Sequence, residues 1–170
     1  MAAYLGFEFI DAAEVVRFDE NGDFQSEITN EIMSARLEKA KNAVIPGFYG
    51  ATEEGRVVTF SRGGSDITGS LVARAVNADL YENWTDVSGF LIADPRIVKG
   101  SKSIETITYK ELRELSYMGA SVLHEDAIFP VRKEGIPINI RNTNSPEDKG
   151  TLIVAVSYTH LRAHETSLHL

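Results

Sequence analysis

Apolar side chains recur about once per helical turn among charged residues between Ser26 and Ala40, which predicts a surface helix over this stretch. A second stretch, Ile67–Val76, has the same spacing, and Asp66 stands where it could cap the first turn. Two helices are therefore predicted in the first half of the chain.

Two further helices are predicted in the second half. Thr108 and Glu111 form a plausible capping box for a helix that runs through Met118, with a glycine near its end. A fourth helix is predicted over Glu125–Lys133, although Pro130 would bend or split it.

Short apolar runs between the helices predict strands. Ala43–Phe48 and Arg56–Phe60 flank a loop that ends in Glu53–Gly55, which is typical of a hairpin because glycine can supply positive φ. Strands and helices alternate, so the economical fold is α/β with a largely parallel sheet covered on both faces. The other predicted strands are Phe7–Ile10, Val15–Phe18, Leu80–Trp84, Phe90–Ala93, Ile136–Ile140 and Thr151–Ala155.

The composition fits one folded domain and narrows the range of partners. The chain has 170 residues, of which 43% are hydrophobic and 25% charged, and this is enough apolar surface for a core. Its formal charge of -8 argues against binding to nucleic acid, which demands a basic surface. No apolar run approaches the roughly 20 residues of a membrane span. The absence of cysteine excludes disulfides and fits a reducing, cytoplasmic location.

The last residues of the chain differ in composition from the rest. His160 and His164 are one helical turn apart, a spacing that could hold zinc, and His169 follows them. Residues Val156–Thr166, however, match the translation of a string that resembles a transposase-type sequencing adapter. We therefore expect residues 156–170 to be a non-native tail, and predict no metal site from their histidines.

The motif Ser-Arg-Gly-Gly-Ser-Asp, residues 61–66, stands between a predicted strand and a predicted helix. Its adjacent glycines let backbone N–H groups face a ligand, and the helix presents its positive end to an anion. Arg62 can hold a carboxylate through two parallel hydrogen bonds, and Ser65 adds a hydroxyl. Ordinary tight turns with an N-cap have the same pattern, so the pattern alone leaves both interpretations open.

A second polar group follows a predicted strand, in the segment from Asn83 to Arg96. Thr85 and Asp86 stand just beyond the strand, at the edge where sheets of this class bind ligands. Arg96 ends the segment in an Asp-Pro-Arg sequence and could meet phosphate oxygens. Local chemistry alone favours the simpler interpretation, in which these are turn residues and a surface ion pair.

Two single residues could also carry function. His124 is the one histidine that precedes the tail, but no second ligand or nucleophile can be assigned to it, which favours a helix-end residue bonded to the backbone. Trp84 could stack on an adenine, yet a single tryptophan within a strand is usually a core residue.

Five blocks follow one another in the chain: VIPGFYG, SRGGSD, NWTDVSGFLIADPR, YKELRELSYMGASVLHEDA and IPINIRNT. In this order and at these separations they resemble the middle of an aspartate kinase, of the amino-acid kinase family, over essentially Met1–Gly150. The resemblance implies a truncated three-layer α/β/α sandwich with a mainly parallel sheet, in which residues 1–155 form the nucleotide-side portion of the kinase domain. It also implies transfer of the γ-phosphoryl group of ATP to the side-chain carboxylate of L-aspartate, Mg²⁺ bound through the nucleotide, and a homo-oligomeric parent.

The resemblance also implies roles for matching residues. In the family the arginine of the glycine-rich block helps to hold the amino acid, which places L-aspartate at Arg62, Gly63, Gly64 and Ser65. Asp66 would lie at the reacting centre as an organiser of a catalytic lysine, since an ionised substrate carboxylate needs no base. The residues implied on the nucleotide side are Thr85, Asp86, Leu91, Arg96 and Ser121.

The chain departs from the family pattern at several points. Ser61 replaces a glycine, Leu91 stands where many relatives have tyrosine, and Ser121 replaces a lysine expected near the phosphates. The KFGG segment that carries the catalytic lysine has no counterpart, nor do the regulatory ACT domains. We therefore expect an interior fragment that is inactive by itself. The alternatives are another member of the superfamily, acting on glutamate, acetylglutamate or a nucleotide, and a noncatalytic nucleotide-binding module.

Overall fold

The computed structural model describes residues 1–93, 97–117, 123 and 125–156. The described residues divide into two compact units, one drawn from residues 1–78 and 123–134 and the other from residues 79–117 and 135–156. In the described part of the chain, no helix has the length and apolar character needed to cross a membrane.

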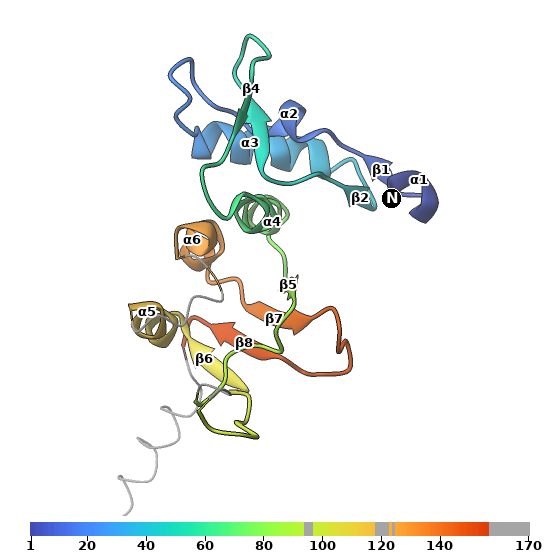
Figure 1. The fold of residues 1–170 in the computed structure, drawn as a ribbon. Helices are drawn as coiled ribbons and strands as arrows, with labels where there is room; N and C mark the ends of the chain where they lie inside the picture. The colour runs from blue at the N-terminus through green and yellow to red at the C-terminus, as the bar shows by residue number, and fades with distance from the viewer. Residues whose placement is uncertain (94–96, 118–122, 124, 157–170) are drawn as a thin grey trace, which may run out of the picture. The chain divides into compact units, whose positions relative to one another are not determined.

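Short strands and five helices make up the described part of the first unit (Figure 1). β1 (Glu8–Phe9) pairs in parallel with β2 (Ala43–Val44). β3 (Tyr49–Ala51) and β4 (Val57–Thr59) form an antiparallel hairpin. The helices are α1 (Ala2–Leu5), α2 (Ala12–Val15), α3 (Ser26–Leu37), α4 (Gly64–Ala75) and α6 (Glu125–Glu134).

One hydrophobic cluster forms the core of the first unit. α3 contributes Met33 and Leu37 to it and α4 contributes Leu71, so the apolar faces of both helices pack into the same core. Met33 and Leu71 are at most 1% exposed, and burial of a side chain of this size contributes about 1.5–3 kcal/mol. The rings of Phe18 and Phe60 extend the cluster, with centroids 5.0 Å apart.

A four-stranded sheet organises the second unit, in the order β5-β7-β8-β6 (Figure 1). β5 (Tyr81–Thr85) is parallel to β7 (Ile138–Asn142), and β6 (Thr106–Thr108) is parallel to β8 (Thr151–Val154). β7 and β8 are antiparallel. α5 (Tyr109–Tyr117) packs on β6 and β8.

The start of α5 is fixed by the predicted capping box. The Thr108 N–H donates to Glu111 Oε2 over 2.6 Å, and the Glu111 N–H donates to Thr108 Oγ1 over 3.1 Å. Two N–H groups of the first turn are thereby satisfied by side chains. On the sheet, Ile138, Ile140 and Ile153 are completely buried, so the strands carry the core of this unit.

The α/β class is confirmed, and three of the five strand pairs in the described part are parallel. The four predicted helices are present with small shifts of their ends. Pro130 was predicted to bend or split the fourth of them; α6 is one continuous helix with Pro130 inside it, so it is not split.

Two predicted strands are only partly formed. In the run Val15–Phe18, Val15 is the last residue of the short helix α2, which Asp11 caps by accepting a hydrogen bond from the Ala13 N–H over 2.9 Å. This local cap outweighs the strand preference of Val15, whereas Arg17 and Phe18 form bridges, to Ala51 and Phe24. In the run Phe90–Ala93, only Leu91 forms a bridge, to Ser103.

The hairpin is present, but its first strand lies later than predicted. Phe48 has a φ of 72°, and this left-handed conformation separates Ala43–Val44, which pairs with β1, from the hairpin strand β3. The predicted cap at Asp66 is also wrong. α4 begins three residues earlier than predicted, at Gly64, and Asp66 lies in its first turn.

Candidate functional site

The glycine-rich block lies in the first unit, where β4 leads into α4. Gly63 is the N-cap of α4, with φ 58° and ψ 24°, a left-handed conformation that favours glycine. Gly64 is needed for a different reason, because a Cβ added there would lie 2.7 Å from Phe48 Cα. The two glycines therefore allow a tight turn and a close backbone approach.

The N-terminus of α4 offers a place for an anion. The N-cap residue Gly63 has no side chain to cap the helix, and the first backbone hydrogen bond joins the Ile67 N–H to the Gly63 carbonyl over 2.9 Å. Arg62 and Ser65 are exposed at this end, and Arg62 makes no hydrogen bond or ion pair among the described residues. Backbone N–H groups, the positive end of a twelve-residue helix and a guanidinium thus lie together.

A neighbouring loop supports this helix end. The Phe48 N–H donates to Thr68 Oγ1 over 3.1 Å, and Thr68 Oγ1 donates to the Gly64 carbonyl over 2.8 Å. Gly47 lies so close to the block that an added Cβ would be 3.0 Å from Ser65 Cα. The sequence predicted no role at this helix end for Phe48, which was expected to end a strand, or for Thr68.

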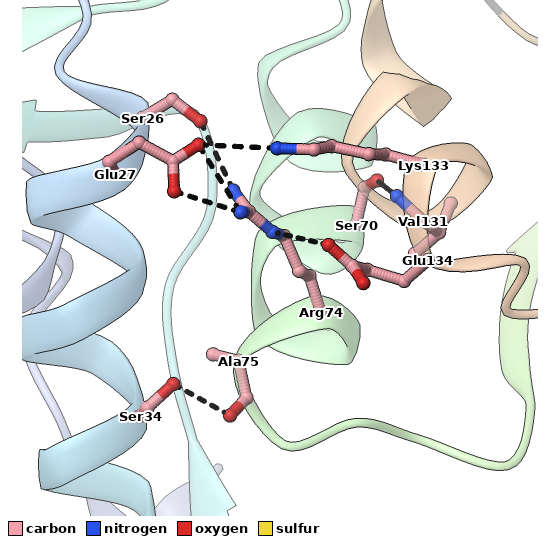
Figure 2. Close-up of polar contacts among 9 residues, drawn as sticks. All are labelled: Ser26, Glu27, Ser34, Ser70, Arg74, Ala75, Val131, Lys133 and Glu134. Carbon is pink, nitrogen blue, oxygen red and sulfur yellow. Dashed lines mark hydrogen bonds and ion pairs between the residues drawn. The ribbon is translucent and has the colours of Figure 1, made fainter.

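Farther along α4, Arg74 connects three helices of the same unit (Figure 2). Its side chain is only 8% exposed, and its Nη2 lies 3.0 Å from Glu27 Oε2 on α3 while its Nε lies 3.3 Å from Glu134 Oε1 on α6. Lys133 Nζ adds a contact of 3.6 Å to Glu27 Oε1. The hydrogen bond and charge of Arg74 lower the pKa of Glu27. This cluster fixes the helix that carries the glycine-rich block.

The second predicted group lies in the second unit, at the carboxyl end of β5. Thr85 is the last residue of that strand and pairs with Asn142, the last residue of the parallel strand β7. The Thr85 carbonyl accepts hydrogen bonds from both the N–H and the Oγ1 of Thr143, over 2.8 and 2.9 Å. Asp86 is exposed, and its Oδ1 accepts a hydrogen bond of 3.3 Å from Thr85 Oγ1. This edge is where α/β sheets bind ligands.

The other predicted residues have different outcomes. Leu91 is 36% exposed and forms its bridge to Ser103. Arg96, Ser121 and His124 lie outside the described residues. The expectation of a core position for Trp84 is wrong, because its side chain is 43% exposed and stacks with Arg141, whose Cζ is 4.8 Å from the ring centroid.

The structure therefore brings the predicted residues together in two groups, one in each unit. Arg62, Ser65 and Asp66 share the N-terminal end of α4, and Thr85 and Asp86 share the end of β5. Within the described ranges, no group of three or more His, Cys, Asp or Glu side chains is arranged to hold a metal ion.

With the glycine-rich start of α4 and the polar residues at the end of β5 described, comparison with known protein families identifies the family of this chain. Residues 3–142 match the model of the amino acid kinase family, and the chain belongs to this family. It is 41% identical over 167 residues to aspartokinase 3 of Bacillus subtilis, covering 91% of this chain and 36% of that protein.

Solved structures agree with this assignment. The crystal structure of Clostridium acetobutylicum aspartate kinase matches with a TM-score of 0.86 and 64% identity, over 94% of this chain and 36% of that one. E. coli aspartokinase III in complex with aspartate and ADP matches with a TM-score of 0.76 and 31% identity, over 88% of this chain and 35% of that one. The chain thus spans little more than a third of the length of each of these three relatives.

Proposed function

We propose that this chain is the part of an aspartate kinase that holds L-aspartate and the nucleotide. The observation that carries the proposal is the start of α4, where exposed Arg62 lies beside Gly63, a left-handed N-cap residue without a side chain. The close similarity to aspartate kinases, at 41% and 64% identity, supports the choice of amino acid.

In the proposed reaction, L-aspartate binds through Arg62 and the backbone N–H groups of Gly63 and Gly64, with Ser65 adding a hydroxyl. A side-chain carboxylate oxygen of the substrate attacks the γ-phosphorus of ATP, the bond from that phosphorus to the β–γ bridging oxygen breaks, and ADP leaves. The products are 4-phospho-L-aspartate and ADP. The attacking carboxylate is already ionised, so we assign Asp66 to orienting a cationic partner and not to proton abstraction.

Such a transfer depends on placement and on neutralising the oxygen charge. We assign the nucleotide to Thr85 and Asp86, and by family resemblance also to Leu91, Arg96 and Ser121. Mg²⁺, when bound to the phosphates of the nucleotide, would supply further positive charge there. We further propose that the parent is a cytoplasmic homo-oligomer.

The test is calorimetric titration of the 170-residue chain with L-aspartate and, separately, with Mg-ADP. We expect Arg62→Ala to abolish measurable binding of L-aspartate and to leave Mg-ADP binding unchanged, because Arg62 is assigned to the amino acid alone. Arg56→Ala is the matched control: Arg56 is an exposed arginine of the same unit, its side chain is bonded only to the Glu20 carbonyl in the described part, and the loss of that side chain should change neither affinity.

Three outcomes would contradict the proposal. Binding of Mg-ADP but not of L-aspartate by the unaltered chain would point to a noncatalytic nucleotide-binding module. Tighter binding of L-glutamate or uridine monophosphate than of L-aspartate would point to another member of the family. Equal aspartate affinity in the unaltered chain and in Arg62→Ala would remove the assigned role of the guanidinium.

A further inference from the structure

A chain of side-chain hydrogen bonds links the segment after Thr85 and Asp86 to the loop between β7 and β8. Asn142 Nδ2 donates to Ser88 Oγ over 2.9 Å, and Ser88 Oγ donates to Asp148 Oδ2 over 2.6 Å. The Ser88 hydroxyl thus accepts one hydrogen bond and donates another, which orients it fully. We call Ser88, Asn142 and Asp148 the serine clamp.

The main chain of the same segment is attached on both sides of Ser88. Before it, the Thr85 carbonyl accepts two hydrogen bonds from Thr143, over 2.8 and 2.9 Å. After it, the Phe90 N–H donates to Thr151 Oγ1 over 2.9 Å. Residues 85–90 are therefore held at their beginning, middle and end by one partner region.

That partner region is itself well supported. The Asn144 N–H donates to Asn142 Oδ1 over 2.9 Å, which closes the first turn of the loop. Arg141 Nη2 donates to the Pro146 carbonyl over 2.6 Å, and the Arg141 guanidinium is stacked against Trp84. The loop can therefore act as a fixed support for the segment that carries Thr85 and Asp86.

We propose that Ser88 and Asp148 are positioning residues for the nucleotide, acting through Thr85 and Asp86. The inference rests on the proposed function, and its ligand is a Mg²⁺-bound nucleoside diphosphate or triphosphate. Neither residue is assigned a contact with the ligand. The clamp fixes the segment before the ligand arrives, so less conformational freedom is lost when the nucleotide binds.

The experiment compares variants of the 170-residue chain by titration with Mg-ADP and with L-aspartate. Ser88→Ala and Asp148→Ala should each weaken Mg-ADP binding about three- to tenfold, the effect of losing one orienting hydrogen bond, and leave L-aspartate binding unchanged. The double variant should be no weaker than either single one, because both changes break the same link. Ser88→Thr keeps the hydroxyl and should retain the affinity.

Glu147→Ala is the matched control, since Glu147 is the exposed acidic neighbour of Asp148 in the same loop, and its removal should change neither affinity. A readout independent of the ligand is amide hydrogen exchange without nucleotide, which should become faster across residues 85–90 in Ser88→Ala. All measurements are made at a temperature well below the Tm of every variant, so that a general loss of stability does not change the apparent affinity.

An unchanged rate of amide hydrogen exchange across residues 85–90 in Ser88→Ala would show that the serine clamp does not hold this segment. Faster amide exchange with unchanged Mg-ADP affinity would show that the serine clamp holds the segment without positioning the ligand. Either result overturns the inference while the proposed function stands. Failure of the unaltered chain to bind Mg-ADP would instead refute the proposed function, and this inference with it.

Discussion

Removing the hydroxyl of Thr151 should destabilise the second unit strongly, although the side chain keeps its shape in Thr151→Val. Thr151 is completely buried at the start of β8. Its Oγ1 accepts a hydrogen bond from the Phe90 N–H over 2.9 Å and donates one to the Ile104 carbonyl over 2.6 Å. Gly89 packs so closely that an added Cβ would lie 2.2 Å from Thr151 Oγ1, which leaves no room for a replacement water.

The size of the effect follows from the two groups that lose their partner. A buried N–H or C=O left unsatisfied costs about 1–3 kcal/mol, so two such groups cost about 2–6 kcal/mol. The added methyl of valine offsets about 0.8 kcal/mol of this cost. We expect a loss of about 3 kcal/mol, which is a large share of the roughly 5–15 kcal/mol of a typical domain. For a chain of this length it corresponds to a fall in Tm of about 6–12 °C.

The assay is urea unfolding followed by tryptophan fluorescence. Trp84 is the single tryptophan of the chain and lies on β5, in the same unit as Thr151, so the signal reports on that unit. The matched control is Thr151→Ser, which keeps the hydroxyl, loses one methyl and should cost about 1 kcal/mol. If Thr151→Val unfolds at the same urea concentration as Thr151→Ser, with the same m-value, the two hydrogen bonds do not carry the stability assigned to them.

Two other predictions concern stability. Gly150→Ala should prevent the second unit from folding, because the new Cβ would lie 1.8 Å from the Ile140 carbonyl oxygen. Gly135→Ala is the control, since Gly135 has the same φ of 71° with no atom nearer than 4.0 Å, and it should lower the free energy of unfolding by only about 1–2 kcal/mol. Equal urea midpoints for the two variants would refute the steric argument. Arg74 lowers the pKa of Glu27 from its ordinary value of 4.5, so Glu27 stabilises the fold above the unfolded-state pKa and loses this contribution as the pH falls through the folded-state pKa. The difference in unfolding free energy between the unaltered chain and Glu27→Gln, followed by circular dichroism, should therefore be present at about pH 7 and shrink as the pH falls below the ordinary value of 4.5 towards the lower folded-state pKa; a difference independent of pH would contradict it.

The glycine-rich block could be predicted from sequence because its chemistry is local. A strand, two glycines and a helix start are consecutive in the chain, so Arg62 and Ser65 had to lie at one helix end. The Arg74 cluster could not be predicted in this way, since its partners Glu27 and Glu134 are 47 and 60 residues away. No local pattern distinguishes an arginine that joins three helices from one that faces solvent.

Errors in the predicted strands have a similar origin. The run from Val15 to Phe18 has the composition of a strand, but Asp11 caps a helix that ends at Val15, so only Arg17 and Phe18 of the run form bridges. Trp84 was expected in the core because tryptophan is large and apolar. Arg141 covers its ring instead, and that contact depends on the pairing of Trp84 with Arg141 across β5 and β7. Pairing of distant strands decides such positions, and a single sequence does not contain it.

Each of the two candidate binding segments depends on a buried threonine to which no contact with a ligand is assigned. Thr68, 3% exposed, accepts from the Phe48 N–H and donates to the Gly64 carbonyl beside the glycine-rich block. Thr151 accepts from the Phe90 N–H and donates to the Ile104 carbonyl at the end of the segment that carries Asp86. In each case one hydroxyl joins two stretches of backbone and uses both its donor and its acceptor, so its removal leaves two groups unsatisfied. The placement of groups that would face a substrate is thereby set by residues outside every motif, and substitutions at these threonines should reduce stability and affinity together.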